Sequence, residues 1–330
     1  ACSDSNFKVV YNLSDDCTVT LFSVNFWIKM KNSLSFLLQT HEEIPDTEID
    51  ILIRLEDEIQ RTFLALNSYD WNDLFDKDYG ISSKSFDFAT IFILSSSTLL
   101  LVLNSGVKDK HLFKESLFAL LFELLHNIQG SVLPMFEYQE TTSQTLQVNA
   151  SQTSKLIKKQ VKLIELIGAF LSKTTVGDSM ITHMEYFAFQ YIFADATDSE
   201  ENKLAIDLEE LRRCSSDLLL TISRKHPEQS QFIVNEMFAN LDNISQLKSR
   251  SRKYRLSRGI SVQHITILLL RTVQAMDCSD YSFENEYWRM TGSGSSSRYS
   301  QNKVVAEITT KFFKHLDKKI KYSSETCNQI

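Results

Sequence analysis

The sequence predicts an all-α fold, built as an irregular α-solenoid of HEAT-type antiparallel helix pairs. Its 330 residues include only three prolines and eight glycines, so long uninterrupted helices are possible. Apolar residues recur at helical spacing along most of the chain, and breaks in that pattern group the helices in pairs. The pairs are spaced more widely than the usual repeat of about 40–47 residues. An ordinary globular helical domain is the alternative.

The N-terminal half contains the less certain elements. We expect helix pairs at 20–40 with 47–66 and at 85–104 with 111–129. Residues 18–29 and 86–94 are rich in β-branched and aromatic side chains and could form strands, but their helical neighbours favour helices. The stretch "IFILSSSTLLLVL", 91–103, is shorter than the 18 to 20 residues, roughly, of a membrane span. We interpret it as a buried helix and expect no membrane association.

The C-terminal half has clearer periodicity. Three further pairs are predicted, at 153–172 with 179–194, at 203–225 with 228–242, and at 260–278 with 302–321. Pro227 ends one helix and suits the first turn of the next. Two long loops, 130–148 and 279–301, separate helices. The "GSGSSS" within the second loop is either a native flexible stretch or a place where a longer insertion was shortened. The whole chain, 1–330, is interpreted as one solenoid segment.

Catalytic and metal-binding motifs are absent from the sequence. Its five cysteines form no Cys-x-x-Cys pair, which indicates neither a disulfide framework nor a zinc site and fits a reducing compartment. Asp76, Asp78 and Asp87 match three positions of a calcium-binding loop, but Gly80 and Ile81 break that pattern. The His183-Met-Glu185 triplet is predicted to be a helix-surface pair. We therefore predict no enzymatic activity, no metal and no cofactor.

A concentrated basic segment stands out in a chain whose net charge is −7. The stretch "LKSRSRKYRLSRG", 247–259, contains six basic residues and no acid. It is either a solvated loop or a contact with a polyanion, and double-stranded DNA bound without sequence preference is the polyanion that it would suit. We call this stretch the basic ribbon; its candidate DNA contacts are Lys248, Arg250, Arg252, Lys253, Arg255 and Arg258.

Two lysine-bearing helix faces could extend this DNA-binding surface, although each could equally be an ordinary solvated helix face. The first is predicted to carry Lys155, Lys158, Lys159 and Lys162, opposite apolar residues that include Ile157 and Val161. The second is predicted to carry Lys311, Lys314, Lys318 and Lys321.

The basic ribbon and the helix after it resemble a known family. The segment "SRKYRL", followed by "VQHITILLLRTVQ", is similar to the middle of the large subunit of the cohesin loader, the Nipped-B (adherin) family of HEAT-repeat proteins. There an Arg-rich segment precedes a helix with this pattern of Gln, Thr and Leu. The preceding "SRKHPEQSQFIVNEMFANL", 223–241, resembles the helix pair upstream of it. The resemblance covers residues 203–321, and residues 1–200 show only helical compatibility.

The resemblance implies a nuclear, chromatin-associated solenoid that contacts DNA together with cohesin's kleisin and SMC ATPase heads. It would promote cohesin's ATP hydrolysis and loading without hydrolysing anything itself. The family also has a tetratricopeptide-repeat partner subunit, which binds an N-terminal segment not recognisable here. The alternative hypothesis is a HEAT-type adaptor for transport or trafficking whose basic ribbon docks an acidic protein.

Overall fold

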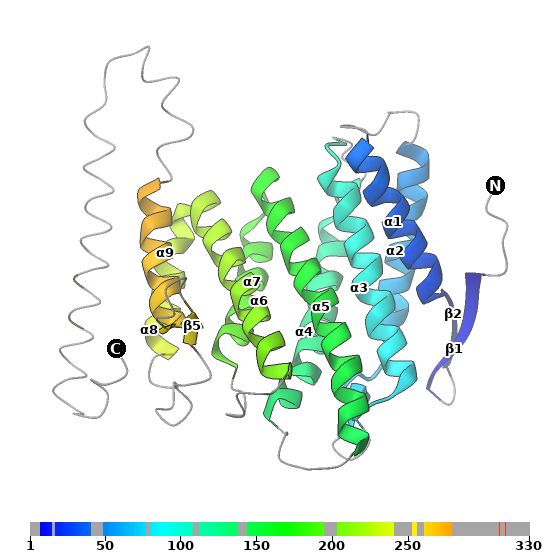
Figure 1. Cartoon of the computed structure of the whole chain (residues 1–330). Helices are drawn as coiled ribbons and strands as arrows, with labels where there is room; N and C mark the ends of the chain where they lie inside the picture. The colour runs from blue at the N-terminus through cyan, green and yellow to red at the C-terminus, as the bar shows by residue number, and fades with distance from the viewer. Residues whose placement is uncertain are drawn as a thin grey trace.

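The computed structural model describes the main helices and three short hairpins. The described residues are 7–14, 17–40, 49–76, 80–107, 112–137, 144–194, 203–240, 253–255 and 261–278, with isolated positions at 310 and 314. All-α architecture is confirmed, and the helices stand side by side in a row, as a solenoid requires (Figure 1). The predicted helix at 302–321 lies outside the described residues apart from Thr310 and Lys314.

The helices form two layers. The first layer contains α1 (Val24–Thr40), α3 (Ser83–Asn104), α5 (Gln144–Lys173), α7 (Lys203–Lys225) and α9 (His264–Cys278), and each of these packs on the next. The second layer contains α2 (Ile49–Asn67), α4 (Glu115–Glu137), α6 (Asp178–Phe193) and α8 (Ser230–Asn240), with α4 packed against both α2 and α6. Successive helices thus alternate between layers, which is the arrangement expected of stacked antiparallel pairs.

Short antiparallel hairpins correct two of the helix predictions. Residues 18–22, expected to be helical, belong to β2 (Cys17–Phe22), which pairs with β1 (Lys8–Ser14). Their β-branched and alternating residues suit a strand, and the helix starts only at Val24. Residues 261–263 form β6 (Ser261–Gln263) against β5 (Lys253–Arg255), so the predicted helix from 260 begins at His264 instead. A third hairpin joins β3 (Phe75–Asp76) to β4 (Gly80–Ile81).

The predicted loop at 130–148 is largely helical. Helix α4 continues through Pro134 to Glu137, and α5 begins at Gln144. A proline inside a helix removes one hydrogen bond and costs about 3 kcal/mol. Val132 and Phe136, one turn apart, are both buried in the core, and burying two such side chains recovers a similar free energy. The Ser131 hydroxyl also donates to the Trp71 carbonyl at 2.7 Å, which ties this turn to the short 3₁₀ segment before β3.

Helix α3 is the centre of the N-terminal half. Residues 88–100 are all buried, so residues 86–94 are helical as predicted and 91–103 are largely enclosed by protein. By length and composition α3 and α4 could each cross a membrane, but 78% of the most apolar window of α3 is buried by neighbouring helices. Ser95, Ser97 and Thr98 cost little to bury, because their hydroxyls donate to carbonyls one turn earlier, whereas the buried Ser96 hydroxyl has no hydrogen-bond partner.

A buried carboxyl on α6 corrects the helix-surface prediction for His183 and Glu185. His183 is exposed, but Glu185 is only 1% exposed and its Oε1 has no hydrogen-bond partner. Two residues along a helix are about 200° apart, so both cannot share one face. Burial, reinforced by the nearby Glu236 carboxylate of α8, raises the pKa of Glu185 to about 7.

We expect the Glu185→Gln variant to gain stability relative to wild type as pH rises. Because the pKa of Glu185 is higher in the folded than in the unfolded state, protonation of this carboxyl stabilises the fold. That contribution is complete below about pH 4.5 and is lost as pH rises through about 7. The difference in unfolding free energy should change by on the order of 2 kcal/mol in favour of the variant between pH 5 and 8. Urea denaturation across that range measures it. Glu123→Gln, at an exposed site on α4, is the control. Parallel curves for wild type and Glu185→Gln would contradict the assignment.

Candidate nucleic-acid interface

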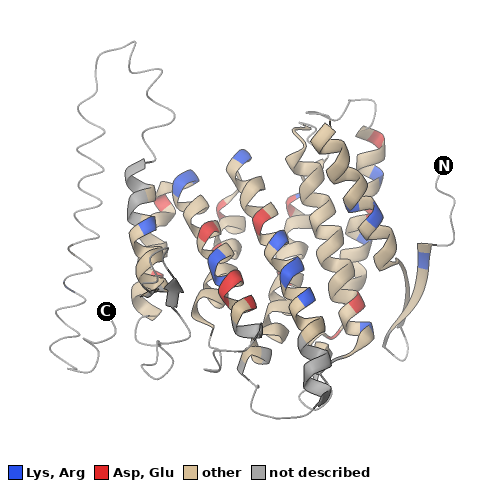
Figure 2. Ribbon diagram, in the orientation of Figure 1, with Lys and Arg blue, Asp and Glu red and all other residues tan. Residues whose placement is uncertain are grey.

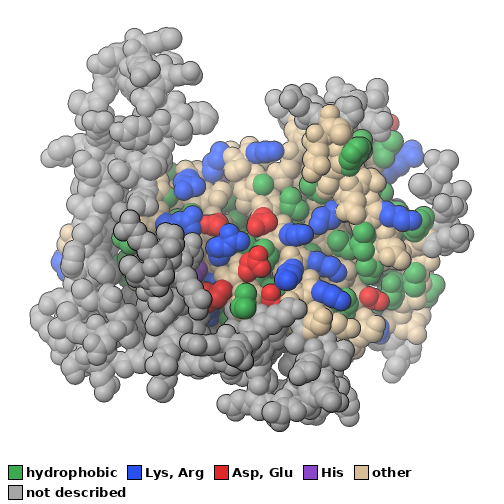
Figure 3. Space-filling model, viewed as in Figure 1, with side chains coloured by type: hydrophobic (Ala, Val, Ile, Leu, Met, Phe, Trp, Pro, Cys, Tyr) green, Lys and Arg blue, Asp and Glu red, His purple; other side chains and the backbone are tan. Residues whose placement is uncertain are grey.

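The lysines of α5 lie on the solvent face of the first layer. Lys155, Lys158 and Lys162 are exposed, whereas Leu156, Ile157, Val161 and Leu163 between them are buried. This segregation follows from the 3.6-residue period of a helix, which places positions three and four apart on one side. The predicted lysine face of α5 is therefore present as a surface. Figure 2 marks blue positions along the ribbon of α5, and Figure 3, in the same orientation, shows blue side chains on that part of the face toward the viewer.

Lys159 is held at the inner edge of that face. Its Nζ donates to the Thr90 hydroxyl at 3.2 Å and lies 5.3 Å from the ring centroid of Phe86, both on α3. Burial lowers the pKa of Lys159, and the neighbouring Lys155 and Lys31 lower it further, while Asp87 opposes the shift. The amine is thus positioned by α3, where the repulsion from two lysines opposes the attraction of Asp87.

Lys31 of α1 joins this group, and the sequence analysis missed it. It is half-buried, and its pKa is lowered first by burial and then by Lys162 of α5. Helices α1 and α5 both pack on α3, so their lysines approach each other across it. The sequence contains a weak signal, since α1 carries Lys29 and Lys31 and no acid. We call Lys31, Lys155, Lys158, Lys159 and Lys162 the lysine cluster.

Acidic side chains near the lysine cluster are few. Asp87 of α3 is the acid that influences Lys159; burial raises the pKa of this carboxyl, and Lys159 opposes that shift. The neighbouring α7 differs. There Arg212 pairs with Glu209, Arg213 lies 4.0 Å from Glu210, and Asp217 accepts from Arg271 of α9 at 2.8 Å. Arg212 and Arg213 are thus paired with acids of their own helix and Arg271 with an acid of α7, whereas the sequence of α5 contains five lysines and one acid, Glu165.

Part of the basic ribbon is an antiparallel hairpin next to α9. The backbone of Lys253, Tyr254 and Arg255 forms β5, with Lys253 opposite Gln263 and Arg255 opposite Ser261. Lys248, Arg250, Arg252 and Arg258 lie outside the described residues, as do Lys311, Lys318 and Lys321, while Lys314 is exposed. Of the three predicted basic features, the structure therefore describes one fully, the lysine face of α5.

Comparison with known proteins shows similarity both in sequence and in structure. The sister chromatid cohesion protein mis4 of Schizosaccharomyces pombe is 24% identical over 237 residues, which covers 67% of this chain and 14% of mis4. The C-terminal fragment of the Chaetomium thermophilum cohesin loader SCC2 superposes with a TM-score of 0.64 at 18% identity, covering 82% of this chain and 21% of the fragment. No family model matches the chain. The predicted family resemblance is confirmed, and the chain spans well under a quarter of either relative.

We expect Lys31→Met to raise the unfolding free energy by a few tenths of a kcal/mol, a small value because the site is only half-buried. Methionine keeps the apolar stem but removes a charge that burial and Lys162 disfavour. Lys29→Met is the control, since Lys29 is exposed and lies over the Phe7 ring. Urea denaturation at low salt measures both. A loss of 1 kcal/mol or more, roughly, in Lys31→Met would mean that the ammonium is stabilised in the fold.

Proposed function

We propose that this chain, which resembles the Nipped-B family of cohesin loaders in sequence and in fold, is a non-catalytic HEAT-type segment that holds double-stranded DNA beside cohesin. The lysine cluster is the observation that carries the proposal. In this role the segment would work in the nucleus, on chromatin, and contribute to promoting cohesin's ATPase and its loading. Cohesin's kleisin and SMC heads would be its protein partners, and the tetratricopeptide-repeat loader subunit would bind elsewhere.

The electrostatics of the lysine cluster suit phosphates. Five ammonium groups from two helices form the cluster, and two of the five are half-buried. Asp87 of α3 and Glu165 of α5 are the only acids in the sequences of α1, α3 and α5. Charges that are disfavoured by burial and mutual repulsion reduce stability, and residues of this kind are common at binding sites, where a ligand supplies the missing counter-charge. A DNA backbone would supply it, and each lysine that neutralises a phosphate would release condensed counterions.

The expected recognition is independent of DNA sequence. The lysine cluster lies on packed helices α1 and α5 whose apolar faces are buried, so neither helix is free to enter a groove of the duplex. Lysine ammonium groups on such a surface can neutralise phosphates but read no base edges. The residues of the basic ribbon, Lys248, Arg250, Arg252, Lys253, Arg255 and Arg258, and the C-terminal lysines Lys311, Lys314 and Lys318, are proposed as further phosphate contacts.

Binding of random-sequence duplex DNA across a salt series tests the proposal. We expect the Lys158→Ala, Lys162→Ala variant to lower the magnitude of the log-log salt slope by about 1.8. The matched control, Arg54→Ala with Arg61→Ala, also removes two exposed cations, but from α2 in the second layer. It should leave the slope unchanged. Fluorescence anisotropy with a labelled duplex provides the measurement.

A variant with the six ribbon residues changed to Ala tests the second basic feature in the same assay. If all six contact phosphates, the slope falls by about five. Equal slopes for wild type and both cation variants would contradict DNA binding by these surfaces. That outcome would favour the adaptor hypothesis, in which the basic surface docks an acidic protein with a defined stoichiometry.

A further inference from the structure

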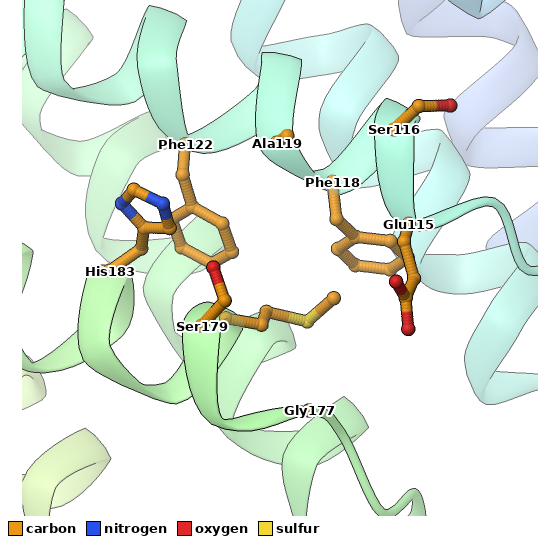
Figure 4. A pocket seen from close by; sticks show the side chains of 9 residues that line it. Glu115, Ser116, Phe118, Ala119, Phe122, Gly177, Ser179 and His183 are labelled. Carbon is orange, nitrogen blue, oxygen red and sulfur yellow. The ribbon is translucent and has the colours of Figure 1, made fainter.

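A pocket opens between the N-terminal turns of α4 and α6, in the second layer. Phe118, Phe122 and Met180 form its apolar floor, and Glu115, Ser179 and His183 lie around its rim. The rings of Phe122 and His183 are nearly parallel, 8° apart, with centroids separated by 6.3 Å. Figure 4 shows Glu115, Phe118 and Phe122 of α4 opposite Ser179 and His183 of α6. The pocket thus combines a rigid aromatic floor with a polar edge.

The size of the pocket restricts what can occupy it. Its volume is about 270 Å³, just below the roughly 300–1,000 Å³ of sites that enclose a whole small molecule. The space suits one large apolar side chain of another protein rather than a cofactor. Phe118 packs on Phe170 of α5 with centroids 5.2 Å apart, so the floor is anchored in the core and already formed. A preformed pocket of this kind is what an anchor residue requires.

The second layer around the pocket has the opposite charge from the lysine cluster. Helices α4, α6 and α8 contain no lysine or arginine in their sequences, and their six carboxyl residues are Glu115, Glu123, Glu137, Asp178, Glu185 and Glu236. By contrast, α1, α3 and α5 contain eight lysines and only Asp87 and Glu165 as acids. Glu115 lines the pocket, and exposed Asp178 lies between the lining residues Gly177 and Ser179. A cationic partner is therefore favoured here, and a nucleic acid is repelled.

We propose that this pocket docks a basic peptide segment of a partner protein, which inserts one aliphatic or aromatic side chain between α4 and α6 and directs flanking Lys or Arg side chains toward Glu115 and Asp178. The inserted side chain packs on Phe118, Phe122 and Met180. The site lies in the other layer from the lysine cluster and does not depend on DNA binding.

Selection of a displayed library of random 12-residue peptides on the whole chain tests the proposal. We expect the selected peptides to share an apolar residue flanked by Lys or Arg. Synthetic fluorescein-labelled copies should bind in anisotropy titrations, and their affinity should fall with salt because of the carboxylates at the rim. Random-sequence duplex DNA should not displace them.

Two tryptophan variants locate the binding. Ala119→Trp places a large side chain at the exposed α4 position that lines the pocket, and should weaken peptide binding at least about tenfold. Ala169→Trp makes the same change at an exposed position of α5, away from the pocket, and should leave the affinity unchanged. Glu115→Lys should weaken binding of the same peptides and flatten its salt dependence. Circular dichroism melting curves establish that each variant is folded.

Four outcomes would overturn the proposal. The library could yield no enriched peptides, the enriched peptides could be acidic, or they could bind wild type and folded Ala119→Trp equally. If duplex DNA displaced the peptides from wild type, and Ala119→Trp abolished the binding of that DNA, the pocket would be assigned to a nucleic acid instead. Loss of DNA binding in the lysine variants would have no bearing on this result, since those lysines lie on the first layer.

Discussion

The burial of α3 is the constraint on which the N-terminal half of the structure depends. Its residues 88–100 are all buried, and such a helix is stable in water only if neighbours cover it on every side. Helices α1, α2 and α5 supply that cover. Because α1 and α5 both lie against α3, Lys31 and Lys162 come close enough to lower the pKa of Lys31. The apolar packing of one helix thus creates the charged surface above it.

The two layers carry different chemistry. Lysines predominate on α1, α3 and α5, while α4, α6 and α8 have carboxylates and no basic residue. In a solenoid, alternate helices face opposite sides, so residues far apart in sequence accumulate on one surface. A net charge of −7 hides the contrast between these two groups of helices. The two proposals accordingly assign a polyanion to the lysine-rich helices and a basic protein segment to the acidic ones.

Polar contacts fix how the layers meet. The Gln129 side chain of α4 donates to the Phe187 carbonyl of α6 at 2.8 Å, and the Tyr191 hydroxyl of α6 donates to Gln160 of α5 at 3.2 Å. All three side chains are buried, so a shift in register would leave their polar groups without partners, at a cost of roughly 1–3 kcal/mol each. Apolar packing alone is less directional. These contacts keep α6 at the height that forms the pocket with α4.

Much of the fold was predictable from the sequence by itself, because the period of apolar residues records which positions of a single helix face inward. That period, with the helical neighbours of residues 18–29 and 86–94, predicted the helices that the structure describes from α1 to α9, and the period predicted the lysine face of α5. The period predicted the ends of helices less well. Burial of Phe136 extends α4 beyond Pro134, and a hairpin occupies residues 18–22, where the start of α1 was expected. Only the tertiary structure decided that Lys31 joins the α5 lysines, that Glu185 is buried, and that Phe122 and His183 form a pocket. A periodic pattern contains no information on which helices become neighbours. Each of these three sites depends on residues of two different helices.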